Sequence, residues 1–338
     1  MINTLDIIVE PQLLAKPKPV PWPRLPRVTH PQKNRVVGRI GIEWPHPGPI
    51  VVTPDGSRAY IGMRIGPKHG IVVIDTVANK AVGAITLSRA YYKLTRRDLA
   101  VKDLAISPDG SRIYALTKHG IIGIDPQNDK VVDRIRIGGR AMAITPDGSR
   151  LIISGAGPEI PGSGAGVVGV LDLQTNVKIA VIPVGRNPGA IAIRPDGPRA
   201  YVINARDNSM SVIDLGTYQE ISKISIRSLG GGRIAITPDS SRAYISTARS
   251  NRIIVVNLNN NQRIAVVRLS GYARYGARSI VISPDGLRVF LRSGQVIDTT
   301  TNQVIGVIHS YRGGPGMAFS SDGSRMYSAL RDEVIVVE

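Results

Sequence analysis

The chain has 338 residues, a formal net charge of +18 at pH 7 and no cysteine. Without cysteine it can form neither disulfide bridges nor thiolate metal sites, and no run of 18 apolar residues suggests a membrane-spanning helix. Because aromatic residues make up only 4% of the sequence, the core has to be built from Val, Ile, Leu and Ala.

Residues 1–33 form a first segment that differs from the rest of the chain. It starts with a β-prone run and continues with seven prolines, which favour an extended, semi-rigid arm. We expect this arm to dock on a partner protein by adding a strand to the partner's sheet, which would make the chain a component of a larger assembly. The residues expected to make the docking contacts are Leu5, Ile7, Ile8, Val9 and Trp22.

The first ten residues lack the cationic start of a secretory signal and carry two acidic residues. The expected location is therefore the cytoplasm, or the interior of a macromolecular assembly such as a virion.

Residues 34–338 are predicted to form one domain of repeats. The motif Thr-Pro-Asp-Gly-Ser-Arg at Thr53–Arg58 occurs seven times with small variations, and its aspartates fall at 55, 109, 147, 196, 239, 285 and 322. Repeats of roughly 40–45 residues that are built from short apolar strands are typical of β-propeller blades. The Pro-Asp-Gly core of the motif favours a tight turn between two strands.

The third repeat shows how a blade is expected to form. Ala141–Thr145, Leu151–Ser154, Val167–Asp172 and Val177–Val184 are its predicted strands, from the innermost to the outermost. The third of them is mostly apolar, as expected when both faces of a strand are covered by neighbouring blades.

The last repeat supplies only three strands and ends with Val334–Val337. The missing strand is predicted at residues 34–40, because Asn-Arg-Val-Val-Gly-Arg-Ile there matches the fourth-strand sequence at Asn79–Ile85. The predicted fold is therefore an all-β, seven-bladed β-propeller of four-stranded antiparallel blades. An N-terminal strand completes the last blade and closes the ring, and an extended Pro-rich arm precedes it.

The fourth repeat carries the clearest family signature. It has Asn-Pro-Gly-Ala-Ile-Ala-Ile-Arg-Pro-Asp-Gly at Asn187–Gly197, Ala-Tyr-Val-Ile-Asn at Ala200–Asn204, and Ser-Val-Ile-Asp at Ser211–Asp214. This pattern resembles the YVTN family of β-propeller repeats, and the resemblance covers residues 34–338. It implies the propeller fold but no single activity, since that family includes surface-layer, periplasmic and nucleic-acid-binding members.

Positive charge is predicted to gather on one rim of the propeller. The loops that precede the first strands, and those that join second to third strands, reach this rim, whereas the Pro-Asp-Gly turns reach the opposite one. Arginine suits forked contacts to phosphate, sulfate or carboxylate, and tyrosine can stack on bases or sugars. The predicted residues for binding an anionic or acidic partner are Arg89, Tyr91, Tyr92, Lys93, Arg96, Arg97, Arg140, Arg186, Tyr272, Arg274, Tyr275, Arg278 and Arg312. The alternative is a solvated basic surface that only keeps the protein in solution.

The sequence offers little for catalysis. The seven turn aspartates, and those that end the third strands, are expected to form turns. His69 and His119 occupy matching Lys-His-Gly positions in adjacent repeats, which is too far apart for one shared ion. We therefore predict no catalytic residue, no cofactor and no metal site, although an enzyme is not excluded.

The first functional hypothesis is thus a non-catalytic interaction scaffold that is a structural component of a larger assembly. One alternative is a propeller that binds single-stranded nucleic acid or a phosphate backbone. Two others are a structural or receptor-binding propeller of a virion or phage tail, and a propeller hydrolase or lyase.

Overall fold

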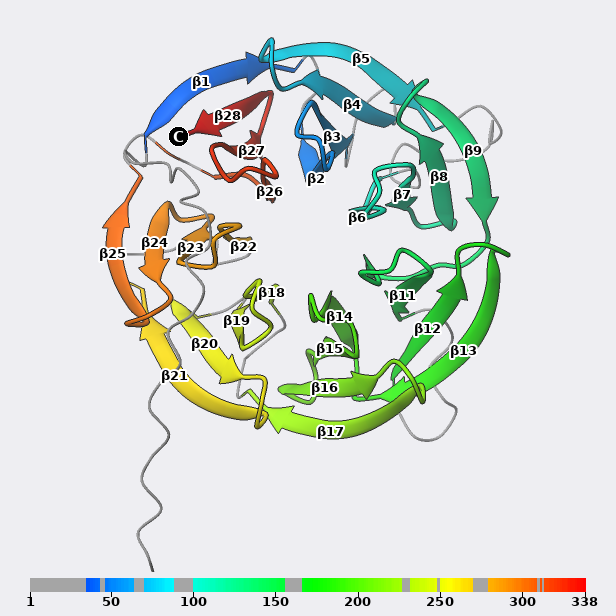
Figure 1. The fold of residues 1–338 in the computed structure, drawn as a ribbon, viewed down its shortest axis with the longest axis vertical. Helices are drawn as coiled ribbons and strands as arrows, with labels where there is room; N and C mark the ends of the chain where they lie inside the picture. The colour runs from blue at the N-terminus through cyan, green and yellow to red at the C-terminus, as the bar shows by residue number, and fades with distance from the viewer. Residues whose placement is uncertain are drawn as a thin grey trace, which may run out of the picture.

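Seven four-stranded antiparallel sheets are arranged radially around a common axis, as Figure 1 shows. The computed structural model describes residues 35–42, 46–63, 70–87, 100–155, 166–226, 232–247, 250–269, 279–308, 311 and 313–338. The predicted docking arm, including Leu5, Ile7, Ile8, Val9 and Trp22, lies outside these residues. No helix that could cross a membrane is found in the described part of the chain.

Blades 1 to 6 each use four consecutive strands, and the first strand of each blade lies nearest the axis. Blades 1 to 3 contain β2 (Pro47–Val52), β3 (Arg58–Met63), β4 (Gly70–Asp75), β5 (Lys80–Thr86), β6 (Asp103–Ile106), β7 (Ile113–Leu116), β8 (Ile121–Asp125), β9 (Lys130–Ile135), β10 (Ala141–Ile144), β11 (Arg150–Ser154), β12 (Gly166–Asp172) and β13 (Val177–Val184). Blades 4 to 6 contain β14 (Pro188–Ile193), β15 (Arg199–Asn204), β16 (Ser209–Asp214), β17 (Gln219–Ser225), β18 (Ile234–Ile236), β19 (Arg242–Ser246), β20 (Arg252–Asn257), β21 (Gln262–Arg268), β22 (Ile280–Ile282), β23 (Arg288–Leu291), β24 (Gln295–Asp298) and β25 (Gln303–Val307). The third blade therefore has the four predicted strands, with ends that differ by one residue at most.

Blade 7 combines the two ends of the described chain. Its strands are β26 (Gly316–Phe319), β27 (Met326–Leu330), β28 (Glu333–Val337) and β1 (Val36–Gly41). Figure 1 shows β1 outside β28, and the two strands pair antiparallel, with Ile40 opposite Val334. This pairing confirms the predicted closure of the ring by a strand from the N-terminal side.

The core lies between the blades. Buried apolar side chains of the described residues form seven clusters, and each cluster combines side chains from two adjacent blades. Second and third strands are buried almost throughout, whereas outer strands such as β9 alternate between exposed and buried residues. Each blade is therefore stabilised by its neighbours, as expected of stacked repeats.

The repeated Thr-Pro-Asp-Gly-Ser-Arg motif forms the turn between the first and second strands. In blade 1 the Thr53 hydroxyl donates a hydrogen bond to Asp55 Oδ1 over 2.5 Å, and the Ser57 N–H donates to the same oxygen over 3.0 Å. Gly56 takes a φ of 73°, in the left-handed region that favours glycine. The hydrogen bonds from Thr53 and Ser57 lower the pKa of Asp55. These bonds confirm that the motif aspartate is a turn former, as predicted.

In blades 1, 5 and 7 the arginine that ends the motif and the tyrosine two residues later both bond to a carbonyl of the next blade, on the rim of the Pro-Asp-Gly turns. In blade 1 the Tyr60 hydroxyl is 3.1 Å from Pro126 O and 2.9 Å from Asp129 Oδ1, both in blade 2. The Arg58 guanidinium donates to the same carbonyl over 3.2 Å. Blade 7 repeats this link toward blade 1, where Arg325 and Tyr327 contact the carbonyl of Thr76.

We expect Tyr60→Phe to lower the free energy of unfolding by about 1–2 kcal/mol, because it removes the hydrogen bonds of a buried hydroxyl to the next blade. Tyr114→Phe is the matched control: Tyr114 is the equivalent residue of β7, and its hydroxyl makes no hydrogen bond to any described residue. The control should change the free energy of unfolding by less than about 0.5 kcal/mol. Chemical denaturation of both variants measures the difference, and equal losses would contradict an interblade role for the Tyr60 hydroxyl.

Candidate anion-binding site

The structure describes two of the predicted anion-binding residues, Arg140 and Arg186. The remaining predicted residues lie outside the described part of the chain, so the structure does not place them; they are Arg89, Tyr91, Tyr92, Lys93, Arg96, Arg97, Tyr272, Arg274, Tyr275, Arg278 and Arg312.

Arg140 lies immediately before β10, where the chain passes from blade 2 to blade 3. Its guanidinium donates to the side-chain oxygen of Asn187, which precedes the first strand of blade 4. A Cβ built on Gly155 would lie 3.4 Å from Arg140 Cγ, so the aliphatic part of the side chain runs over this glycine. The amide of Asn187 fixes the guanidinium in position, and no described carboxylate forms an ion pair with it.

Arg186 differs, because its charge is already paired. Its Nε lies 2.5 Å from Asp207 Oδ1, and its backbone N–H donates to Asp207 Oδ2 over 2.7 Å. Burial opposes ionisation of Asp207, but the hydrogen bonds from Arg186 outweigh it and lower the pKa of this carboxyl group. The cation at the connection from blade 3 to blade 4 is therefore neutralised by a carboxylate of the protein.

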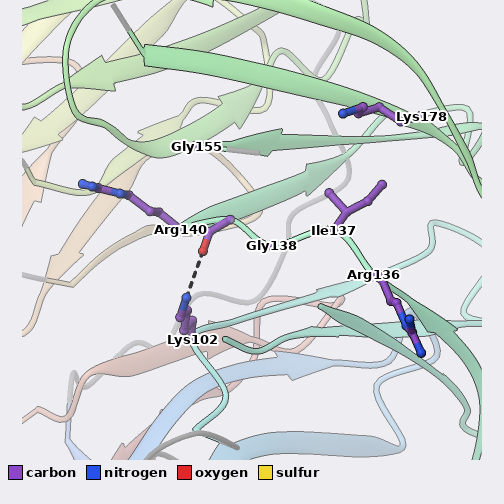
Figure 2. Close-up of a pocket in the computed structure, with 8 residues that line it drawn as sticks. Lys102, Arg136, Ile137, Gly138, Arg140, Gly155 and Lys178 are labelled. Carbon is purple, nitrogen blue, oxygen red and sulfur yellow. Dashed lines mark hydrogen bonds between the residues drawn. The ribbon is translucent and has the colours of Figure 1, made fainter. Parts of the chain in front are cut away.

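A cavity of about 440 Å³ opens between blades 2 and 3, around the connection from β9 to β10. Figure 2 shows the cations that line it, which come from three segments: the residue before β6, the β9–β10 connection and the start of β13. The lining residues, named here the blade 2/3 crevice, are Lys102, Arg136, Ile137, Gly138, Gly139, Arg140, Gly155 and Lys178. Four of these residues are cationic and none is acidic.

Lys102 is the most confined of the four cations. It lies just before β6, is partly buried, and donates from Nζ to the carbonyl oxygen of Gly139 over 3.1 Å (Figure 2). Burial lowers the pKa of Lys102, and the positive charges of Arg140 and Lys118 lower it further. The crevice is thus a place where positive charge is crowded, and an anion bound there would relieve this repulsion.

Two glycines shape the connection. A Cβ on Gly139 would lie 2.4 Å from Ile153 Cγ2, so only glycine lets the connection pass this close to β11. The connection is attached at both ends, by the N–H of Ile137 to the oxygen of Ile135 and by the N–H of Arg140 to the oxygen of Ser154, each at 2.9 Å. Gly138 is exposed, so the backbone at this position is accessible to a ligand, whereas Gly139 is buried against β11.

Sequence analysis does not include Arg136 and Lys178 among the candidate residues. Arg136 follows the last residue of the outer strand β9, and Lys178 is the second residue of the outer strand β13. They meet because the end of one outer strand lies beside the start of the next around the ring. The signal that could have found them is this adjacency, combined with a β9–β10 connection (residues 136–140) that has two arginines and no acidic residue.

The histidines form no metal site within the described residues. His119 lies in the turn between β7 and β8 and His46 just before β2, while His69 lies outside the described ranges. No group of three or more His, Asp or Glu side chains in the described part of the chain is arranged to hold a metal ion.

The fold and the crevice together define the chain as a β-propeller with a cationic interblade cavity. No family model and no curated protein matches the chain. Its fold is similar to that of a solved structure of hydrazine synthase from Kuenenia stuttgartiensis, with a TM-score of 0.73 and 17% sequence identity over 88% of this chain and 97% of that chain. At this identity the similarity shows the shared fold alone.

Proposed function

We propose that the protein is a non-catalytic interaction scaffold whose basic loop rim binds an anionic or acidic partner. The observation that carries this proposal is the blade 2/3 crevice, where Lys102, Arg136, Arg140 and Lys178 line one cavity without a carboxylate. Like charges repel each other, so bringing these cations together is electrostatically unfavourable. A bound anion would offset this repulsion.

The net charge of +18 supports the same proposal, since a strongly basic protein attracts anionic partners over long distances. Part of that charge has another role. Arg58, Arg242 and Arg325, on the rim of the Pro-Asp-Gly turns, bond to carbonyls of neighbouring blades and hold the ring together. In the crevice, Lys102 and Arg140 each make one hydrogen bond to a neutral oxygen, and the other two cations make none to a described residue.

The interblade links and cores suit a rigid platform that presents a binding surface without changing shape. We also propose that the blades are of the YVTN type, on the residues of the fourth repeat, Asn187–Gly197 and Ala200–Asn204. The docking of residues 1–33 on a partner remains part of the scaffold hypothesis.

The proposal predicts binding to polyanions that weakens steeply with salt. Labelled heparin, poly-glutamate and a single-stranded oligonucleotide are titrated with the protein by fluorescence anisotropy, and neutral dextran is the control. If the four crevice cations make the contact, the logarithm of the oligonucleotide association constant should fall against the logarithm of salt concentration with a slope of about −3. Absence of binding to all three polyanions at low salt would refute the proposed function. The relative affinities then decide between an acidic protein surface and a nucleic-acid backbone.

A further inference from the structure

The four cations of the blade 2/3 crevice fall into two pairs that are held differently. Lys102 and Arg140 are fixed by hydrogen bonds to Gly139 O and to the Asn187 side chain. Arg136 and Lys178 are exposed, and neither has a hydrogen bond or an ion pair with any described residue. In Figure 2, Arg140 extends toward one end of the crevice, and Arg136 and Lys178 flank the other end.

We propose that this crevice binds a ligand with two or more closely spaced phosphate groups, such as a bisphosphate or a condensed polyphosphate. The inference rests on the proposed function, an anion-binding rim, and specifies the chemistry of the ligand. The two fixed cations would receive one phosphate group and the two exposed cations would close on another.

The charges favour phosphate over carboxylate. A phosphomonoester carries about −1.5 to −2 at neutral pH, so two such groups balance four cations. A carboxylate carries a single charge, so an acidic peptide would have to place four side chains in about 440 Å³. The diesters of a nucleic-acid backbone also carry one charge each and are spread along a chain. Arginine and lysine are the side chains that bind phosphate, by forked hydrogen bonds and as a point charge respectively.

The size and the lining of the cavity agree with this class of ligand. A volume of about 440 Å³ lies within the usual range of small-molecule sites and far exceeds one phosphate ion. Ile137 is the one apolar side chain of the lining, and no aromatic side chain among the lining residues could stack on a base. Recognition therefore depends on the charges of the ligand and not on an apolar or aromatic body.

At the next connection around the ring, from β13 to β14, the arginine before the inner strand already has an anionic partner within the protein. There Arg186 is paired with Asp207, so a carboxylate of the protein itself neutralises this cation. The blade 2/3 crevice has four cations and no equivalent of Asp207 among its lining residues. A bound ligand would therefore neutralise the cations of the blade 2/3 crevice, as Asp207 neutralises Arg186.

The test is isothermal titration calorimetry of the full chain with inorganic tripolyphosphate, inorganic phosphate and citrate at constant ionic strength. Citrate is the carboxylate control, because it is small and carries several negative charges. Tripolyphosphate should bind about tenfold or more tightly than phosphate or citrate, since its phosphate groups carry more charge than carboxylates and can each accept several hydrogen bonds from a pair of cations. Equal affinity for tripolyphosphate and citrate would overturn the phosphate assignment.

A matched pair of double variants locates the site. The combination of Arg136→Gln and Lys178→Gln removes the two exposed cations and should weaken tripolyphosphate binding about tenfold or more. The combination of Arg263→Gln and Arg268→Gln is the control, because these exposed arginines occupy the equivalent positions of the outer strand β21 and remove the same charge. All four side chains are exposed, so both variants should keep the melting temperature of the native chain.

The outcomes separate this inference from the proposed function. If both double variants lose tripolyphosphate binding equally while heparin is still bound, the crevice is not the site but the basic rim keeps its role. If a single-stranded oligonucleotide made of diesters displaces tripolyphosphate and binds more tightly, the ligand is a nucleic-acid backbone and the inference is wrong. If the native chain binds no polyanion at all, the proposed function fails, and this inference fails with it.

Discussion

Ile40→Asp is expected to lower the free energy of unfolding by about 4 kcal/mol, because it places a charge in the closing seam of the ring. Ile40 is 4% exposed and belongs to the core cluster between blades 7 and 1, with Ile61, Tyr327 and Val336. An uncompensated carboxylate there has no cationic partner in the cluster. A loss of this size is a large part of the 5–15 kcal/mol that stabilises a typical protein.

The matched control is Val37→Asp in the same strand. Val37 is 39% exposed, so its substitution should cost no more than about 1 kcal/mol. Differential scanning calorimetry should show a melting temperature lower by roughly 10 °C for Ile40→Asp and little change for Val37→Asp. Similar melting temperatures for the two variants would mean that β1 is not needed to stabilise the ring.

The second large effect is expected in acid. Eight aspartates of the described residues have a pKa below the ordinary value in the folded protein through hydrogen bonds from the hydroxyls and N–H groups of their own turns; they are Asp55, Asp109, Asp147, Asp172, Asp214, Asp239, Asp298 and Asp322. The pKa of Asp207 is lowered by Arg186 instead. The Ser107 hydroxyl and the N–H and hydroxyl of Ser111 lower the pKa of Asp109 to about 2.

A carboxyl group whose pKa is lower in the folded state stabilises the fold at pH values above its unfolded pKa. That contribution is lost as pH falls from the ordinary aspartate value of 3.8 toward the folded value. The melting temperature should therefore stay level from about pH 7 to pH 5 and fall steadily from about pH 4 to pH 2. Each exposed turn contributes little, but the repeats add their contributions.

Repulsion among the many cations also increases in acid and also lowers the stability. The effect of salt distinguishes this repulsion from the protonation of the turn carboxylates. Repeating the scans in about 0.5 M salt screens the repulsion between exposed charges. The decrease in melting temperature that remains in salt is due to protonation of the turn carboxylates, and Asp109→Asn should make this decrease smaller. A fall that disappears in salt would assign acid unfolding to repulsion alone.

The fold was predictable from sequence because the turn motif and its flanking apolar strands are repeated seven times. Any one motif such as Thr53–Arg58 is a weak signal, but seven copies at similar spacing define the number of blades, and the three strands of the last repeat define the closing strand. The turn role of the aspartates followed from the same motif and is confirmed by their hydrogen bonds.

The crevice was less predictable, because a site between blades depends on distances that the sequence does not state. Arg140 is found by its place before an inner strand, but Arg136 and Lys178 lie on or beside outer strands of different blades. The pairing of Arg186 with Asp207 was also not foreseen, since it depends on how the connection at 185–187 meets the turn after β15. In both cases the deciding factor is a contact between loops of adjacent repeats.

The pairing of β1 with β28 has a consequence for how the protein is made. Blades 1 to 6 are contiguous in the chain, so each can form soon after it leaves the ribosome. The strand at Val36–Gly41 must wait until Glu333–Val337 has been translated, and until then its hydrogen-bonding edge has no lasting partner. Closure of the ring therefore depends on one long-range strand pairing late in folding. Before this pairing forms, the free strand edge of a nascent chain can pair with another copy of the protein.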